Sequence, residues 1–178
     1  MAEPGVGDGL DFWSFIELAK ERLAHRFGAS AEVPTEILLT LNRASMVITY
    51  DLESAVHRSR GLTWASFRLL FVIWLAGPLE PKRAAELTGV TKAAVSNLAK
   101  VLIRDGLLTR QPSEDDGRSV QLGLTKRGRA QISELFDEQR LREQAWVDVL
   151  TPAEQQVLVL LLNKLIAGRG DFDIHRRA

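Results

Sequence analysis

The chain has 178 residues, no cysteine, and equal numbers of basic and acidic side chains, 23 of each. The absence of cysteine excludes disulfides, thiolate metal sites and oxidant sensing through a thiol. The hydrophobic content of 46% is that of a globular protein. No apolar run has the length of a membrane span, and the N-terminal sequence lacks a basic region followed by an apolar one. We therefore expect a cytoplasmic protein that has no membrane association.

Two helices are expected before the centre of the chain. The segment Asp11–Arg26 carries apolar residues, Phe15 among them, on one side at helical spacing. A Gly-Ala-Ser-Ala loop at residues 28–31 leads into a longer helix over Ile37–Arg60, which is apolar in its first half and polar toward its end. Gly61 is expected to end that helix.

The next expected helix begins at Thr63 and ends at Gly77-Pro78. It carries a stripe of large apolar side chains: Trp64, Phe67, Leu70, Phe71, Trp74 and Leu75. Such a stripe is more typical of a hydrophobic core than of a cofactor site. We therefore predict that these side chains are buried.

A helix-turn-helix is predicted next. Lys82–Thr88 forms the first helix, and Gly89 can take the left-handed conformation that ends it. Thr91 is expected to cap the second helix by accepting a hydrogen bond from a backbone N–H of the first turn. The short turn between the two helices is typical of DNA-binding motifs.

The second helix is predicted to have two chemically different faces. At about 100° per residue, the outward arc holds Lys92, Ala93, Ser96, Asn97, Lys100 and Arg104. The opposite arc holds Ala94, Val95, Leu98, Ala99, Val101 and Leu102, and only Ile103 lies on the wrong side. Ser and Asn suit base edges, and Lys suits guanine or phosphate. An ordinary amphipathic surface helix would show the same division.

A short β-hairpin is predicted after this helix. Leu107–Arg110 begins an extended segment, and residues 119–124 alternate in the period of two of a half-buried strand. Residues 112–117 have the composition of a turn. Arg118 follows at the base of the hairpin, where it could reach a minor groove or a phosphate. The whole predicts a mainly α fold with a small β-hairpin wing (α+β), a winged helix-turn-helix.

The charges are distributed unevenly along the chain. From Lys82 to Arg129 there are ten basic and five acidic residues, a net charge of +5. The remainder holds thirteen basic and eighteen acidic residues, a net charge of −5. A basic module on an acidic scaffold favours contact with phosphate, although chance would also give such a difference in some chains.

Two further helices are expected at the C-terminal end. The first covers Lys126–Leu150, and the second begins at a capping box from Thr151 to Glu154, with Pro152 in its first turn. The second helix is apolar on every side, and such a helix is buried on every side. We predict that a second subunit covers it, through contacts that include Phe15, Leu158, Leu161, Leu162 and Leu165. The alternative is a monomer whose N-terminal helices wrap this helix.

The wing and the segment after it resemble the MarR family of bacterial transcription regulators. In that family an Asp-x-Arg wing lies nine residues before the Thr of a Leu-Thr-x-x-Gly segment, and Asp116 and Thr125 keep that spacing. Arg118 and Gly128 stand in the matching places, whereas Gly117 replaces the longer side chain that is usual there. The resemblance covers about residues 36–168.

The resemblance implies a dimeric regulator in four parts. These are an N-terminal extension with an extra helix (1–34), an N-terminal dimerisation helix (35–62), a winged helix-turn-helix (63–129) and C-terminal dimerisation helices (130–178). Two modules related by a two-fold axis would bind a pseudo-palindromic duplex. DNA contacts are expected from Thr91, Lys92, Ala93, Ser96, Asn97, Lys100, Arg110, Arg118 and Lys126.

The resemblance also implies a small-molecule effector. Members of that family typically bind small molecules, often aromatic and anionic, between the dimer scaffold and the winged module. Candidate contacts are Arg43 and Arg68 as cations, with Tyr50 and Trp64 as aromatic walls; ion pairing and core packing are the alternatives for each. Urate-responsive relatives have an Asp where this chain has Arg68, so no urate site is expected.

No enzymatic site is predicted. The histidines His25, His57 and His175 lie in no metal-ligand spacing, and neither a phosphate-binding glycine loop nor a nucleophile motif is present. We expect no catalytic residue, no metal site and no cofactor. The sequence predicts a transcription regulator, most simply a repressor, that a small ligand releases from DNA. The alternative is a winged helix used only for protein–protein contact.

Overall fold

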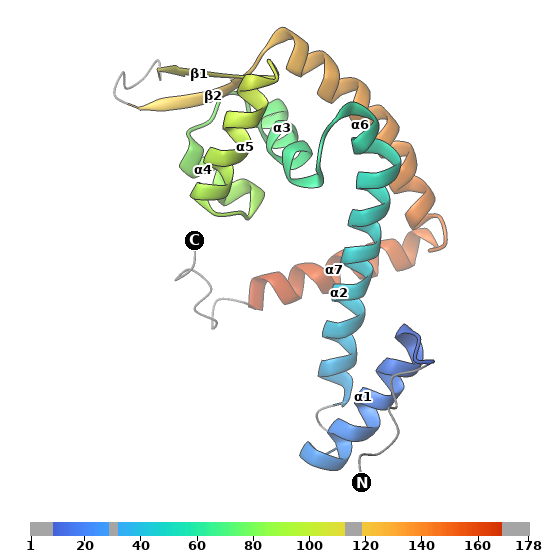
Figure 1. Cartoon of the computed structure of the whole chain (residues 1–178). Coiled ribbons are helices and arrows are strands. Elements are labelled where there is room, and N and C mark those ends of the chain that lie inside the picture. The colour runs from blue at the N-terminus through green and yellow to red at the C-terminus, as the bar shows by residue number, and fades with distance from the viewer. Residues whose placement is uncertain (1–8, 29–31, 113–118, 169–178) are drawn as a thin grey trace. The chain divides into compact units, whose positions relative to one another are not determined.

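The computed structural model describes residues 9–28, 32–112 and 119–168. Its helices and strands are α1 (Phe12–Phe27), α2 (Glu32–Leu52), the π-helical turn η2 (Glu53–His57), the 3-10 turn η3 (Arg58–Arg60), α3 (Trp64–Ala76), α4 (Pro81–Thr88), α5 (Lys92–Arg104), β1 (Leu108–Pro112), β2 (Val120–Leu124), α6 (Lys126–Val147) and α7 (Pro152–Ala167) (Figure 1). The chain forms two units, Met1–Tyr50 and Asp51–Ala178, and the boundary falls within α2.

The first unit contains α1 and most of α2. Asp11 caps α1 by accepting a hydrogen bond from Ser14 N at 2.8 Å, and the Ser14 hydroxyl accepts from Asp11 N in return. Ile16 is buried. Lys20 of α1 lies 3.4 Å from a carboxylate oxygen of Glu36 of α2. The predicted amphipathic helix over Asp11–Arg26 is confirmed.

The long helix predicted over Ile37–Arg60 is not one α-helix. It begins earlier, at Glu32, and after Leu52 it widens into the π-helical turn η2. In this wider turn two consecutive side chains, Val56 and His57, are buried in the core. Gly61 then ends the segment with φ of 71°, as predicted.

The core of the second unit is built around α3. Thr63 caps this helix, and Phe67, Leu70, Phe71 and Trp74 pack in the hydrophobic core as predicted. The ring of Phe136 on α6 lies 5.1 Å from that of Phe71. The predicted burial of Leu75 is wrong: its side chain is 65% exposed. Leu75 lies about 100° around the helix from Trp74, beyond the edge of the stripe.

The helix-turn-helix and the hairpin form as predicted, except that α4 begins at Pro81 rather than Lys82 and that Pro112 lies in a strand. Gly89 has φ of 69° between α4 and α5. The strands pair antiparallel from Leu108 opposite Leu124 to Pro112 opposite Val120. Pro112 therefore belongs to β1 rather than to the turn, because an end position of an edge strand tolerates a missing N–H. Leu79 adds a bridge on the other side of β2, with hydrogen bonds of 3.0 and 2.8 Å to Leu122.

Two helices follow the hairpin. Helix α6 ends at Val147, earlier than the predicted Leu150. The predicted capping box at Thr151 and Glu154 is present at the start of α7, and none of the residues of α7 is buried. In the described ranges, no single helix is long and apolar enough to cross a membrane, and α6 with α7 meets that length only as a pair bent by 101°.

Candidate nucleic-acid interface

The recognition helix α5 presents a short, polar face to solvent. Lys92, Ala93, Ser96, Asn97 and Lys100 are all exposed. The opposite face buries Val95, Ala99 and Leu102. The Thr91 hydroxyl caps the helix by accepting from Ala94 N at 3.2 Å, as predicted. The predicted division of this helix into a polar and an apolar face is thus confirmed at most of its residues.

The predicted faces of α5 are wrong at two residues. Val101 is exposed, and Ile103 is half-buried against the core. The buried arc is rotated by about 40° from the predicted one, because Leu98, Val95 and Ile103 all turn toward the core. The exposed arc therefore ends in an apolar residue, Val101, next to Asn97.

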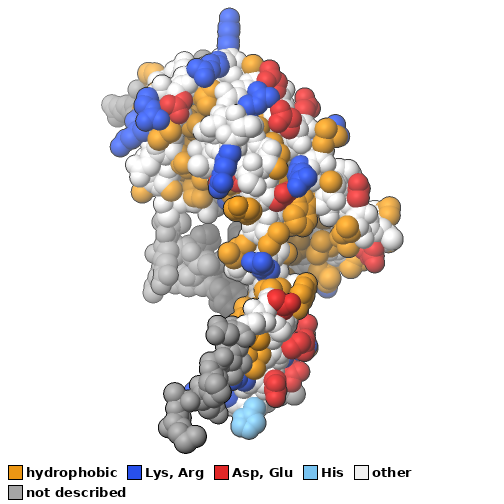
Figure 2. Space-filling model, turned by 45° about the vertical axis from the view of Figure 1, so that its right-hand side comes forward, with side chains coloured by type: hydrophobic (Ala, Val, Ile, Leu, Met, Phe, Trp, Pro, Cys, Tyr) orange, Lys and Arg blue, Asp and Glu red, His pale blue; other side chains and the backbone are white. Residues whose placement is uncertain are grey.

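The polar side chains of this face have no polar partner among the residues that the structure describes. No described residue forms a hydrogen bond or ion pair with the side chain of Lys92, Ser96, Asn97 or Lys100. In contrast, Arg83 pairs with Glu86 at 2.8 Å and Arg104 with Asp105 at 2.9 Å. Arg83 and Arg104 are thus engaged with carboxylates, whereas the lysines of α5 are available to phosphate. Figure 2 shows Lys and Arg side chains standing out from the upper part of the molecule, where the hairpin and α5 lie.

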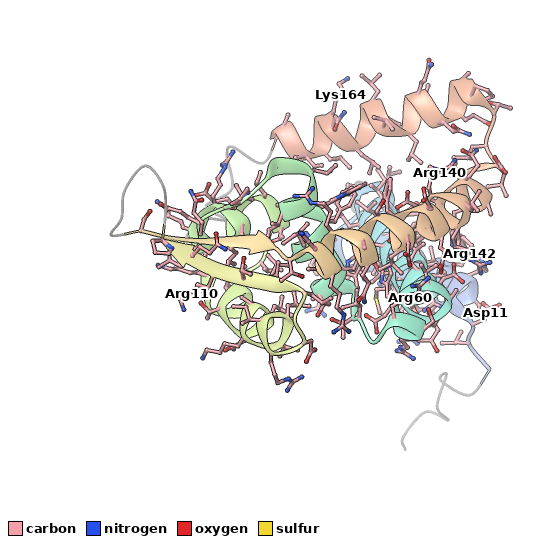
Figure 3. All side chains as sticks on the ribbon, turned by 90° about the horizontal axis from the view of Figure 1, so that it is seen from above. Asp11, Arg60, Arg110, Arg140, Arg142 and Lys164 are labelled. Atoms are coloured by element: carbon pink, nitrogen blue, oxygen red, sulfur yellow. The ribbon has the colours of Figure 1, made fainter. Side chains whose placement is uncertain are left out.

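Two of the other predicted DNA contacts, Arg110 and Lys126, lie on other elements. Arg110 is exposed on β1, opposite Leu122, and projects beside the hairpin (Figure 3). Lys126 begins α6 beside Gly106 and Leu107, at the C-terminal end of α5. A helix of 13 residues is about 20 Å long, so Lys126 is not brought together with Thr91. Arg118 lies outside the described residues.

Thr125 and Gly128 join the hairpin to the recognition helix. Thr125 caps α6 by accepting from Gly128 N at 2.8 Å, and its hydroxyl donates to the carbonyl of Gly106, also at 2.8 Å. A Cβ on Gly128 would lie 2.0 Å from the Leu107 carbonyl oxygen. Only glycine allows this approach, which gives the Leu-Thr-x-x-Gly segment a physical reason. The sequence identified these residues but not their role.

The segment between α2 and α3 holds a buried histidine that sequence reasoning missed as a site. The His57 ring lies 4.5 Å from that of Phe67 and 5.6 Å from that of Trp64, centroid to centroid. Its Nε2–H donates to Gln139 Oε1 at 2.7 Å, and no described residue partners Nδ1. Burial lowers the pKa of His57, against the opposing effects of the Gln139 hydrogen bond and of Glu53 and Glu143. Its only sequence signal was a position beside the apolar Val56.

An acidic residue ties the end of α2 to α6. The Asp51 carboxylate accepts from Arg142 Nε and from the indole N–H of Trp146, each at 2.7 Å. These bonds, first that of Arg142, lower the pKa of Asp51 to about 2. Arg60 adds contacts to Glu134 and Glu138 of α6, at 3.0 and 2.7 Å (Figure 3). The end of α2 and the turn η3, which precede the winged module in the chain, are thus held to α6 by ion pairs.

The four predicted ligand contacts fall in both units. In the first, Arg43 lies over the ring of Phe12, with its guanidinium carbon 5.4 Å from the centroid, and Tyr50 is exposed. In the second, Trp64 stacks on His57 in the core, and a guanidinium nitrogen of Arg68 lies 3.6 Å from the place of a Cβ on Gly89. Arg68 therefore stands at the turn of the helix-turn-helix.

The predicted dimer contacts are apolar and accessible in the isolated chain. Phe15, Leu158, Leu161 and Leu165 are exposed, and Leu162 is half-buried. No group of three or more His, Asp or Glu among the described residues could hold a metal ion.

The fold and the free polar face of α5 define a winged helix-turn-helix DNA-binding protein. A model of the MarR family matches residues 60–119. The "uncharacterized HTH-type transcriptional regulator YwaE" of Bacillus subtilis is 30% identical over 129 residues, which cover 72% of this chain and 75% of that protein. The "HTH-type transcriptional repressor YetL" of the same bacterium is 26% identical over 132 residues, 73% of this chain and 78% of that protein.

A solved structure agrees with these relatives. Bordetella bronchiseptica BpsR, whose DNA binding is regulated by 6-hydroxynicotinic acid, is 27% identical with a TM-score of 0.65, over 71% of this chain and 89% of that one. The chain therefore belongs to the MarR family of transcription regulators. It is a DNA-binding regulator and not an enzyme.

Proposed function

We propose that the protein is a repressor that binds a pseudo-palindromic operator as a homodimer and is released by a small aromatic acid. The observation that carries the proposal is the exposed face of α5, whose polar side chains have no partner among the described residues. A recognition helix needs such groups to bind base edges and phosphates. We assign DNA contacts to Thr91, Lys92, Ala93, Ser96, Asn97, Lys100, Arg110, Arg118 and Lys126.

The homodimer is supported by α7. Its leucines and valines face solvent on every side, and a soluble helix of that composition needs a cover. A second copy of the chain supplies one through Leu158, Leu161, Leu162 and Leu165, with Phe15 of α1 as a further contact. A two-fold axis would then present two α5 helices to half-sites about one turn of DNA apart.

Two relatives support the proposal that the protein is a repressor and that a small ligand releases it from DNA. YetL is a repressor, and the DNA binding of BpsR is regulated by 6-hydroxynicotinic acid, an aromatic acid. In this chain either unit supplies a cation for a carboxylate and an aromatic side chain for the ring: Arg43 and Tyr50 in the first unit, and Arg68 and Trp64 in the second.

The test is binding of the full chain to a duplex from the region upstream of its own gene. Fluorescence anisotropy should give much tighter binding to that duplex than to a scrambled one of equal length and composition. Addition of 6-hydroxynicotinic acid, followed by a panel of benzoic and hydroxybenzoic acids, should raise the apparent Kd for one or more of them. Equal affinity for the two duplexes would reject the specific regulator, and affinity unchanged by every acid would reject only the proposed class of effector.

A further inference from the structure

The exposed face of α5 consists of two lines of side chains with different chemistry. Ala93, Asn97 and Val101 follow one another at intervals of four residues along one edge, and all three are exposed. Lys92, Ser96 and Lys100 form the parallel line. Successive members of a line are about 6 Å apart along the helix axis. One line is therefore an amide between two apolar groups, and the other is a hydroxyl between two cations.

Asn97 is suited to enter a groove. Its amide has no hydrogen-bond partner among the described residues, so DNA binding breaks no internal bond. The side chains beside it on the first and second turns, Ala93, Ala94 and Ser96, are short and let the helix approach the base edges. Its carboxamide offers one donor and one acceptor side by side.

Only one base matches this pair of groups in the major groove. Adenine presents an acceptor at N7 and a donor at N6, and an Asn side chain bonds both at once. Guanine presents two acceptors and matches lysine instead. The methyl of Ala93, one turn away, is suited to the methyl group of a thymine.

We propose that Asn97 reads one adenine in each half-site through N6 and N7, and that Ala93 contacts the methyl of a nearby thymine. The inference rests on the proposed operator binding and specifies which bases the operator contains. Lys92 and Lys100 supply affinity through phosphate or guanine on the parallel line.

Selection from a random duplex library tests the inference with the unmutated chain, Asn97→Ala and the control Leu87→Ala. The wild type should select one adenine column in each half-site, with discrimination of roughly 10- to 100-fold. Asn97→Ala should lose the preference in that column alone. Leu87→Ala, at an exposed residue of α4 to which no DNA contact is assigned, should keep it. Thermal melts that coincide with the wild type would show that Asn97→Ala is folded.

Base analogues test the individual atoms of the bases that the proposal names. Replacement of the selected adenine by 7-deazaadenine removes N7 and should weaken wild-type binding about tenfold, while Asn97→Ala should bind both duplexes equally. Uracil in place of the neighbouring thymine should weaken the wild type to a smaller extent. An adenine preference that persists in Asn97→Ala would overturn the assignment but leave specific binding intact. A wild type that selects no sequence would overturn the proposed operator binding as well.

Discussion

Gly128 sets how closely α6 approaches the end of the recognition helix. The Leu107 carbonyl oxygen occupies the place where a Cβ would stand, at 2.0 Å. We expect Gly128→Ala to push α6 away from Leu107 and to lower the free energy of unfolding by about 1–3 kcal/mol, as overpacking does. The melting temperature should fall by several degrees.

Gly168 supplies the control for this substitution. It ends α7 with φ of −66°, and no atom of the described residues lies within 4 Å of a Cβ built on it. Gly168→Ala should therefore leave the melting temperature unchanged within about one degree. Equal melting of the two variants would contradict the close approach.

His57 makes stability depend on pH near neutrality. Its folded pKa lies below the ordinary value of 6.5 because burial disfavours the imidazolium, so the folded state prefers the neutral ring. Stability from this group is complete above pH 6.5, falls as the pH drops from there to the folded pKa, and falls no further below it. The urea midpoint should be lower at pH 5 than at pH 8.

His57→Phe isolates this contribution because it keeps a ring between Trp64 and Phe67. The variant loses the Gln139 hydrogen bond at both pH values, so only the difference between the two midpoints is compared. That difference should shrink relative to the wild type, since His25 and His175 remain in both proteins. An unchanged difference would assign the pH dependence to other groups.

At the level of elements, charged pairs hold α6 to the end of α2. Asp51→Asn removes the ion pair with Arg142. Because the pair is solvent-accessible, the loss should be about 1 kcal/mol or less, or a few degrees of melting temperature. This loss of stability should be smaller at high salt, because salt screens the ion pair. Arg140→Ala is the matched control, since no described residue forms an ion pair with Arg140, which is exposed on the same helix.

The contribution of the Asp51–Arg142 ion pair to stability also depends on pH. The pKa of Asp51 is lowered from 3.8 to about 2, so its contribution is complete above pH 4 and is lost as the pH falls toward 2. This window begins at a lower pH than that of His57, and the acid titration of Asp51→Asn should lack only the contribution of Asp51.

Elements with strong local signals were predicted from sequence. Thr91, Thr151 and Gly89 fix the ends of their helices through side-chain capping or a positive φ, which depend on a few neighbouring residues. The π-helical turn η2 was not predicted, because it is stabilised by burial of His57 against residues distant in sequence. The burial predicted for Val101 was wrong for a similar reason. Which face of α5 is buried depends on how the helix packs against the rest of the unit, not on its own sequence pattern.

The residues of the candidate site were likewise predicted where a local pattern suffices and missed where packing with distant residues decides. The polar face of α5 follows from helical periodicity alone, so Asn97 and Lys100 were found. The partners of His57 and Asp51 lie on α6, more than eighty residues away, and no local pattern indicates such pairings. The sequence also placed Arg68 in a ligand site, and its position beside Gly89 emerges only from the packing of α3 against α4.

At the level of the whole molecule, the net charge of +5 between Lys82 and Arg129 should make DNA binding steeply dependent on salt. The logarithm of the association constant should fall linearly with that of the salt concentration. Lys100→Ala should reduce the slope by about one if the lysine ammonium neutralises one phosphate. Leu87→Ala, an exposed residue of α4 without charge, should leave the slope unchanged.

The dimer is tested by two leucines of similar exposure. Leu161 on α7 is 51% exposed and Leu75 on α3 is 65% exposed. Leu161→Glu should shift the protein toward monomer in sedimentation velocity and weaken binding to the full operator, because a carboxylate would be buried in the interface. Leu75→Glu should sediment like the wild type. A wild type that is monomeric at micromolar concentration would reject the two-half-site arrangement.

Strand β2 is held on both sides, by β1 and by the bridge to Leu79. Its register is therefore anchored away from the hairpin tip, and the contact between the hairpin and the end of α5, from Thr125 to Gly106, lies at the opposite end of the strands. Mutations that lengthen, shorten or recharge the tip can accumulate without displacing α5. In the evolution of such regulators, the DNA contacts that we propose for the wing and those that we propose for α5 can thus diverge as independent traits.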